Sequence, residues 1–186
     1  VLNNHPALIV DWLIQYRDEK WNWSDISQNP IIVMDVIVQH PELPWDWSCV
    51  CQNPNLTIDV IEQHPELLWN WYCISMNPNI TIVMMEQHPE LPWDWSAASR
   101  KPNLTINTIE QHPDIPWDWN CVSMNPGITM DMIEKYLGLP WDWKCVCQNP
   151  NLTINIIERH PELPWNFNCI SKNPNITIDL MEQHPD

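Results

Sequence analysis

Hydrophobic and polar positions along this chain repeat with a period of 24 residues. Each repeat holds an apolar run with a polar residue at every second or third place, as in residues 56–64. A Pro-Trp-Asp-Trp motif and a second, shorter apolar run follow it. Periods of this length are typical of stacked repeat arrays. Aligned on a recurring proline, the repeats start at Pro6, Pro30, Pro54, Pro78, Pro102, Pro126, Pro150 and Pro174, the last one being partial.

The first apolar run predicts a short helix with a threonine at its start. Thr57 is a good N-cap residue, and Leu56 and Ile61 hold the flanking positions of a hydrophobic staple. Pro65 disfavours helical backbone at His64 and ends the helix there. The capping threonines are Thr57, Thr81, Thr105, Thr129, Thr153 and Thr177.

The second apolar run predicts another helix, over residues 47–52, which Asn53-Pro54 ends. The residue between the two tryptophans is always Asp or Asn, two of the best N-cap residues, and this restricted exchange is the strongest evidence for the helix. The predicted caps are Asp46, Asn70, Asp94, Asp118, Asp142 and Asn166.

These elements predict an all-α solenoid of about eight 24-residue repeats, each of two short helices, as a single array over residues 1–186. The tryptophans, most of them in the repeated motif, are expected to lie in its core. The alternation of Leu56, Ile58 and Val60 leaves a leucine-rich-like β/α solenoid as the alternative. Ile9 and Val33 replace the capping Thr in the first two repeats. The charged, divergent first repeat is interpreted either as a terminal cap or as sequence drift.

The net charge of −16 excludes some partners and favours others. An acidic surface repels phosphate backbones, so no nucleic acid is expected, whereas a basic protein is a suitable partner. No apolar run has the length of a membrane span, so no membrane partner is expected either. The chain begins without Met and stops within a repeat, and we expect it to be a piece of a longer array.

Side chains with possible chemistry recur in columns, and each column has a structural interpretation. A histidine column with a carboxylate two residues on, as in His88 and Glu90, is interpreted as helix C-terminal residues. Neighbouring copies are expected to lie too far apart to share a metal ion. The seven cysteines are expected to be buried, reduced thiols. The sequence therefore predicts no catalytic residue, no metal and no cofactor.

The run Asn79-Ile80-Thr81, Pro92-Trp93-Asp94-Trp95 and Pro102-Asn103-Leu104-Thr105 resembles tandem "NPNIT…PWDW" repeat proteins of giant amoebal DNA viruses of the mimivirus group. The resemblance covers nearly the whole chain. It implies an intracellular repeat protein, in the host cytoplasm or the virion, and it brings no activity. Lys101 and Gly127 depart from the Asn that the repeat pattern has at their positions.

The function predicted from the sequence is a non-enzymatic scaffold that binds a protein partner through an extended surface. Two columns of variable residues are the candidate partner-binding surface: Ser48, Tyr72, Ser96, Asn120, Lys144 and Asn168, and Gln52, Met76, Arg100, Met124, Gln148 and Lys172. The alternative is a structural component that self-assembles into filaments or virion material.

Overall fold

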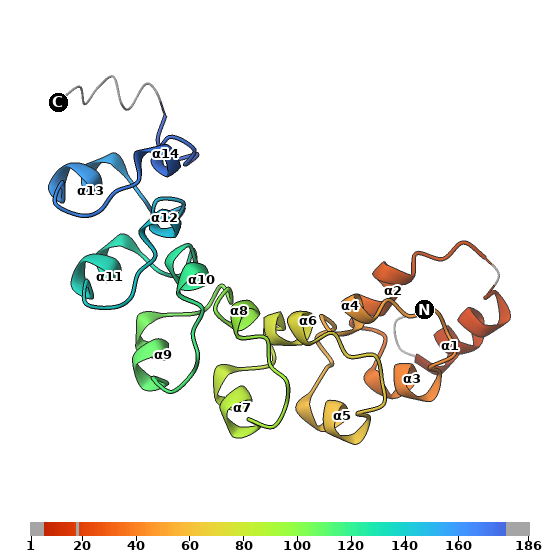
Figure 1. The fold of residues 1–186 in the computed structure, drawn as a ribbon. Helices are drawn as coiled ribbons and strands as arrows, with labels where there is room; N and C mark the ends of the chain where they lie inside the picture. Colours follow the sequence, from red (N-terminus) through yellow and green to blue (C-terminus); the bar gives the residue numbers. More distant parts are fainter. Residues whose placement is uncertain (1–5, 18, 178–186) are drawn as a thin grey trace. The chain divides into compact units, whose positions relative to one another are not determined.

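The computed structural model describes residues 6–17 and 19–177, and every regular element in them is a helix (Figure 1). The described residues form fourteen α-helices and no strand, spaced by the 24-residue period. The predicted all-α solenoid class is confirmed. The leucine-rich-like alternative is wrong, because it requires a strand in each repeat.

The chain divides into two compact halves, Val1–Asp94 and Trp95–Asp186, each described by itself. The N-terminal half contains α1 (Pro6–Gln15), α2 (Trp23–Gln28), α3 (Met34–Gln39), α4 (Trp47–Val50), α5 (Ile58–Gln63), α6 (Trp71–Met76) and α7 (Ile82–Gln87). The C-terminal half contains α8 (Trp95–Ala98), α9 (Ile106–Gln111), α10 (Trp119–Ser123), α11 (Met130–Lys135), α12 (Trp143–Val146), α13 (Ile154–Arg159) and α14 (Phe167–Ile170). The sequence period continues across the division, and the single array stays a prediction.

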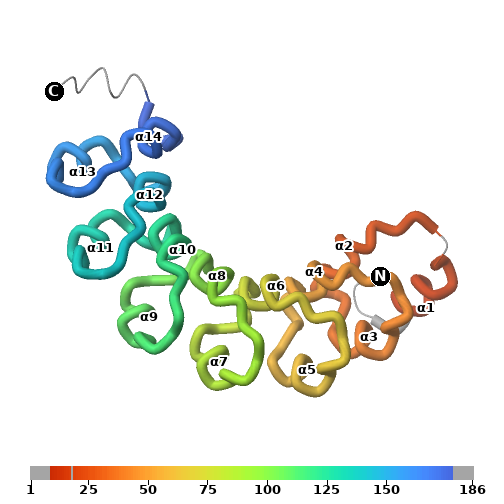
Figure 2. Tube along the Cα trace, in the orientation of Figure 1, coloured from red at the N-terminus to blue at the C-terminus, as the bar shows by residue number. Residues whose placement is uncertain are grey.

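Within each half the helices form two rows, which the Cα trace shows most simply (Figure 2). The first-helix layer consists of α3, α5 and α7 in one half and α9, α11 and α13 in the other. The second-helix layer consists of α2, α4 and α6, and of α8, α10, α12 and α14. Each of the repeats that start at Pro30 to Pro150 therefore contributes one helix to each layer.

The first helices begin at threonine caps. The Thr57 hydroxyl accepts a hydrogen bond from the Val60 N–H, and Thr81, Thr105 and Thr129 do the same in their repeats. Thr153 is the N-cap of α13 without a side-chain bond, as is Val33 for α3. The helix predicted after Thr177 lies outside the described residues.

The second helices begin at carboxylate or amide caps. Asp46 Oδ1 accepts hydrogen bonds from the N–H groups of Ser48 and Cys49, at 3.1 and 3.2 Å. The side chains of four further caps accept in the same way: Asn70, Asp118, Asp142 and Asn166. Asp94 directly precedes α8. These bonds satisfy N–H groups that have no partner within a helix start.

Two predicted boundaries differ from the structure. The helix predicted over 47–52 ends at Val50, because Gln52 and Asn53 bond to carbonyls three residues back, which tightens the last turn. In the first repeat, α1 is a ten-residue helix that begins at Pro6, so Ile9 lies inside it and not at a cap. Proline is well suited to the first turn of a helix, since its missing N–H would have no partner there.

Buried asparagines connect neighbouring repeats. Asn149 is fully buried, and its Nδ2 donates to the carbonyls of Ser123, Asn125 and Ile128 in the equivalent loop one repeat earlier, at 3.0–3.2 Å. Its Oδ1 accepts from the Asn151 N–H in its own loop. The same arrangement recurs at Asn53, Asn77, Asn125 and Asn173. One asparagine side chain therefore donates to carbonyls of the preceding repeat's loop and accepts a hydrogen bond within its own loop.

Paired tryptophans form a second connection. Trp119 of one repeat meets Trp141 of the next edge-to-face, with ring centroids 5.3 Å apart and planes at 89°. The Trp141 indole N–H also donates to the Tyr136 carbonyl in its own repeat. The other edge-to-face pairs are Trp23–Trp45, Trp47–Trp69, Trp71–Trp93 and Trp143–Trp165.

The prediction that the tryptophans lie in the core holds best for the first of the two tryptophans in each Pro-Trp-Asp-Trp motif. Trp45, Trp93, Trp117 and Trp141 are buried, whereas Trp69 and Trp165 are half-buried, as are the second tryptophans such as Trp47. Between the layers, isoleucine, leucine and methionine side chains fill the interior, including Ile37, Ile61, Ile74 and Met85. Burial of this apolar surface stabilises helices that are too short to persist alone.

Candidate interaction surface

Both predicted partner-binding columns lie on the second-helix layer. The first column holds the second residue of each second helix, and the second column lies at the end of that helix or just after it. Eight of the twelve side chains are exposed: Tyr72, Asn120, Lys144, Asn168, Gln52, Arg100, Gln148 and Lys172. The other four, Ser48, Ser96, Met76 and Met124, are half-buried.

Some of these residues also bond within the array. The Asn70 side-chain amide donates to the Ser48 hydroxyl at 3.1 Å, and the Ser96 hydroxyl lies 3.2 Å from Cys121 Sγ. Gln52 donates to the Ser48 carbonyl at 3.2 Å, where α4 ends. The serines of the first column therefore contribute more to the contact between repeats than to the outer surface.

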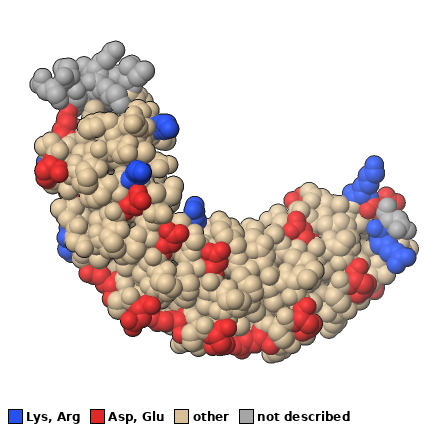
Figure 3. Space-filling view, viewed as in Figure 1, with Lys and Arg blue, Asp and Glu red and all other residues tan. Residues whose placement is uncertain are grey.

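Acidic side chains gather mainly along the first-helix layer (Figure 3). The sequence between residues 21 and 94 contains no Lys or Arg at all. In the C-terminal half, Arg100, Lys144 and Lys172 are exposed at positions of the second-helix layer. The two layers of that half therefore differ in charge as well as in structure.

Histidines end the first helices, as predicted, but their rings bond differently. His40 is the C-cap of α3, and its Nδ1 lies 3.0 Å from Glu42 Oε1 instead of bonding to a helix carbonyl. Glu42's own backbone N–H and then the His40 ring lower the pKa of that carboxyl. The His40 carbonyl accepts from the Trp45 indole at 2.8 Å.

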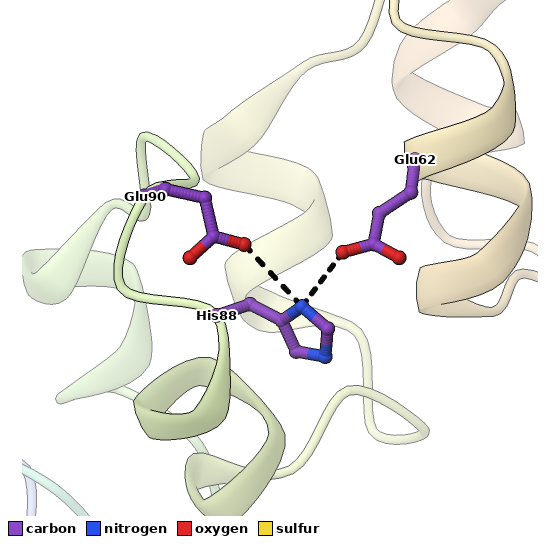
Figure 4. Close-up of side chains that lie close together, drawn as sticks. All are labelled: Glu62, His88 and Glu90. Atoms are coloured by element: carbon purple, nitrogen blue, oxygen red, sulfur yellow. Dashed lines mark ion pairs between the residues drawn. The ribbon is translucent and has the colours of Figure 1, made fainter.

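Carboxylates of one repeat also reach histidines of the next. Glu62 Oε1 lies 2.7 Å from His88 Nδ1, and Glu90 Oε1 lies 3.4 Å from the same nitrogen (Figure 4). Glu134 lies 3.3 Å from His160 in the C-terminal half. Side chains of neighbouring repeats therefore meet here through Glu62, which lies outside the predicted column of histidines and carboxylates. That copies of the column itself do not share an ion stays a prediction.

None of the seven cysteines is paired in a disulfide, and four of them, Cys51, Cys73, Cys121 and Cys147, are buried as predicted. Cys49, Cys145 and Cys169 are half-buried, so the prediction of burial holds only in part. Burial raises the pKa of Cys51 to about 11, and burial together with the Asp142 charge raises that of Cys145 to about 11. Such thiols are weak nucleophiles at neutral pH, because the thiolate is the reactive form. Cys51 Sγ accepts the Asn70 N–H at 3.2 Å, where other repeats use a serine hydroxyl, such as that of Ser27.

Two departures from the repeat pattern lie in the C-terminal half. Lys101 stands at the buried asparagine position with 3% of its surface exposed, and burial lowers its pKa to about 8. Gly127 stands where other repeats have the second Asn of the loop, and a Cβ there would lie 2.5 Å from the Leu104 carbonyl oxygen.

The first repeat exposes apolar side chains beside charged ones. Trp12 and Ile14 of α1, and Tyr16 just after it, are 52%, 39% and 39% exposed. A pocket of about 310 Å³ is lined by Trp12, Leu13 and Ile26. The exposed surface of the first repeat is therefore mixed, apolar as well as charged, and its role as a terminal cap stays a prediction.

Comparison of the chain with protein-family models, with curated proteins and with solved structures found no match. The resemblance to the viral repeat proteins therefore stays a prediction. Among the helices of the described residues, none is long and apolar enough to cross a membrane.

Proposed function

We propose that this chain is a non-enzymatic scaffold that binds a protein partner along its second-helix layer. The observation that carries the proposal is that the constant positions hold the array together, whereas the variable positions are mostly exposed. The constant side chains, such as Asn149, Trp141 and Asp118, bond to neighbouring repeats or to their own helices. The variable columns leave eight of twelve side chains exposed.

Repeat proteins in which each repeat contacts only its neighbours present extended binding surfaces of this kind. Tyr72, Arg100, Lys144 and Lys172 are suited to such a role, since aromatic and arginine side chains supply much of the binding energy at interfaces. A net charge of −16, carried mainly by the first-helix layer, attracts a cationic partner from a distance and speeds its encounter with the chain. The exposed Arg100, Lys144 and Lys172 on the binding layer then pair with acidic groups of that partner. An intracellular setting, in a host cytoplasm or a virion, is proposed on the resemblance alone.

The proposal is tested by selecting displayed peptides on the purified chain and measuring their affinity for four variants. Tyr72 is 48% exposed in the first column, and Val83 is 49% exposed on α7 in the first-helix layer, so Tyr72→Ala and Val83→Ala are matched. Lys144→Ala and Lys135→Ala are the matched pair of exposed lysines in the C-terminal half. We expect at least a tenfold loss of affinity in Tyr72→Ala or Lys144→Ala and less than twofold in both controls. Affinity that depends on the control residues, or on none of the four, would overturn the proposal.

The structural alternative is kept because the contacts between repeats run head to tail, and such contacts can extend between chains. Light scattering over a dilution series separates the two functions. A scaffold keeps one mass at all concentrations, whereas a self-assembling component grows in mass as concentration rises.

A further inference from the structure

Three metal-ligating side chains from two neighbouring repeats converge in the N-terminal half. Glu62 lies in α5, His88 follows α7 and Glu90 lies in the next turn (Figure 4). One ligand atom from each of the three residues lies within 4.8 Å of the other two. The His88 ring faces both carboxylates through the same nitrogen, so the three donors surround one point in space.

The distances suit a small divalent transition ion. Zinc binds histidine nitrogen and carboxylate oxygen at about 2.0–2.2 Å with tetrahedral geometry, which places neighbouring ligand atoms about 3.4 Å apart. The His88 Nδ1–Glu90 Oε1 distance is already 3.4 Å. Glu62 Oε1 lies 2.7 Å from the same nitrogen and must move slightly outward, which the flexible glutamate side chain allows. A neutral imidazole with two carboxylates also carries the two negative charges that offset a divalent ion.

The surroundings of this cluster differ from those of its counterpart in the C-terminal half. Residues 21–94 contain no Lys or Arg, so no basic side chain from this stretch competes for the two carboxylates. In the counterpart, the Arg159 guanidinium lies 3.1 Å from Glu134, the residue equivalent to Glu62. A fixed cation there opposes a metal ion by charge repulsion and occupies a ligand oxygen.

We propose that Glu62, His88 and Glu90 bind one Zn²⁺ ion and that the ion links the repeat of α5 to the repeat of α7. Three protein ligands leave a fourth position for water. The site links elements that the apolar interior already places side by side, so the ion adds a bond between repeats without creating the fold.

The test is a titration of the full chain with Zn²⁺, followed by calorimetry, on wild type and three variants. His88→Gln removes the central ligand and should lower the number of bound zinc ions by one. His64→Gln is the matched control: His64 pairs with Glu66, but residue 38, the equivalent of Glu62, is valine, so zinc binding should not change. Val38→Glu supplies the missing carboxylate beside His64 and should add one bound ion.

Cobalt distinguishes this site from the thiols, which also bind zinc. Co²⁺ bound to nitrogen and oxygen ligands gives weak visible absorption, whereas thiolate ligands add intense charge-transfer bands in the ultraviolet. We expect the weak spectrum, its loss in His88→Gln and unchanged far-ultraviolet circular dichroism. Equal zinc binding by wild type and His88→Gln would overturn the proposal, as would a spectrum dominated by thiolate bands.

Discussion

The two layers hold neighbouring repeats together by different means. The second-helix layer and its Asn-Pro loops use buried directional bonds: Asn149 contacts three carbonyls, and Trp119 meets Trp141 edge-to-face. The first-helix layer uses apolar packing beneath and partly exposed pairs such as Glu62–His88 above. Buried bonds fix geometry and resist salt, whereas exposed ion pairs contribute little and are screened. Stability and register are therefore concentrated in the buried side of the second-helix layer and its loops, and the exposed pairs of the first-helix layer contribute less.

The largest effect is expected from the tryptophan pairs. Trp141→Ala should lower the free energy of unfolding by about 3–5 kcal/mol, because it opens a cavity at a buried ring. Phe167, which stands at the position of the second tryptophan, is 69% exposed, and Phe167→Ala is the control that should cost far less. Urea denaturation of both variants measures the difference. Equal midpoints would contradict the core role of Trp141.

The buried asparagine is expected to come next. Asn149→Ala removes a hydrogen bond from three carbonyls and from the Asn151 N–H. The Asn125 and Ile128 carbonyls keep a second donor, the Ile128 N–H and the Asn151 side chain respectively. Each buried group left unsatisfied costs about 1–3 kcal/mol, so a loss of roughly 3 kcal/mol is expected. Asn151, two residues on, is half-buried and donates to the Pro126 and Ile128 carbonyls. Asn151→Ala should cost clearly less in the same urea experiment. A larger loss in Asn151→Ala would show that the outer amide, and not the buried one, connects the repeats.

The helix caps should show an intermediate effect that depends on pH. Asp46→Ala should cost about 0.5–2 kcal/mol and Asp46→Asn only a few tenths. The exchange is tolerated because a hydroxyl can act in both directions: Ser24 donates to Asp46 Oδ2, whereas Asn70 donates to Ser48.

The same cap predicts the sign of a pH dependence. Hydrogen bonds from the Ser24 hydroxyl and then the Cys49 amide lower the pKa of Asp46 below its usual 3.8. A pKa that is lower in the folded state gives stability that is present above the unfolded pKa and lost as pH falls through the folded one. Wild type should therefore lose stability relative to Asp46→Asn below about pH 4. Parallel thermal melts from pH 6 to pH 2.5 measure this, and a constant difference would contradict it.

The smallest effect is expected in the first-helix layer. Glu62→Gln should cost less than about 0.5 kcal/mol in the presence of a chelator, because its pair with His88 is partly exposed. The loss should disappear at high salt, whereas the loss in Asn149→Ala should persist. Denaturation at low and high sodium chloride compares the two variants. A salt-independent loss in Glu62→Gln would remove the distinction between the layers.

The parts of this architecture that are local in sequence could be predicted from it. The Thr57 and Asp46 caps act on N–H groups two or three residues away, so residue type and spacing are enough to place them. The contacts between repeats could not be derived in this way, because Asn149 and Glu62 reach partners 21 to 26 residues away. The sequence does contain a signal: Asn recurs at the position of Asn149 in six repeats, always before proline, and Lys101 replaces it in one more. Its place at the end of a helix explains the proline but does not reveal the bonds to the preceding repeat.

The candidate surface was predicted in position but not in detail. Variability along the columns located the exposed Tyr72 and Lys144, but it could not show that Ser48 faces the next repeat. That assignment depends on how closely the second helices pack, which no spacing within one repeat determines.

The acceptors that Asn149 uses are backbone carbonyls, and this has a consequence for how such a chain changes length. A carbonyl is present whatever side chain its residue carries, so a copied repeat finds its partners on any neighbour of the same shape. In-frame duplication or deletion of 24 residues therefore preserves these hydrogen bonds between neighbouring repeats without compensating substitutions. A gene built this way can lengthen or shorten its product by whole repeats, while the surface residues of each copy diverge independently.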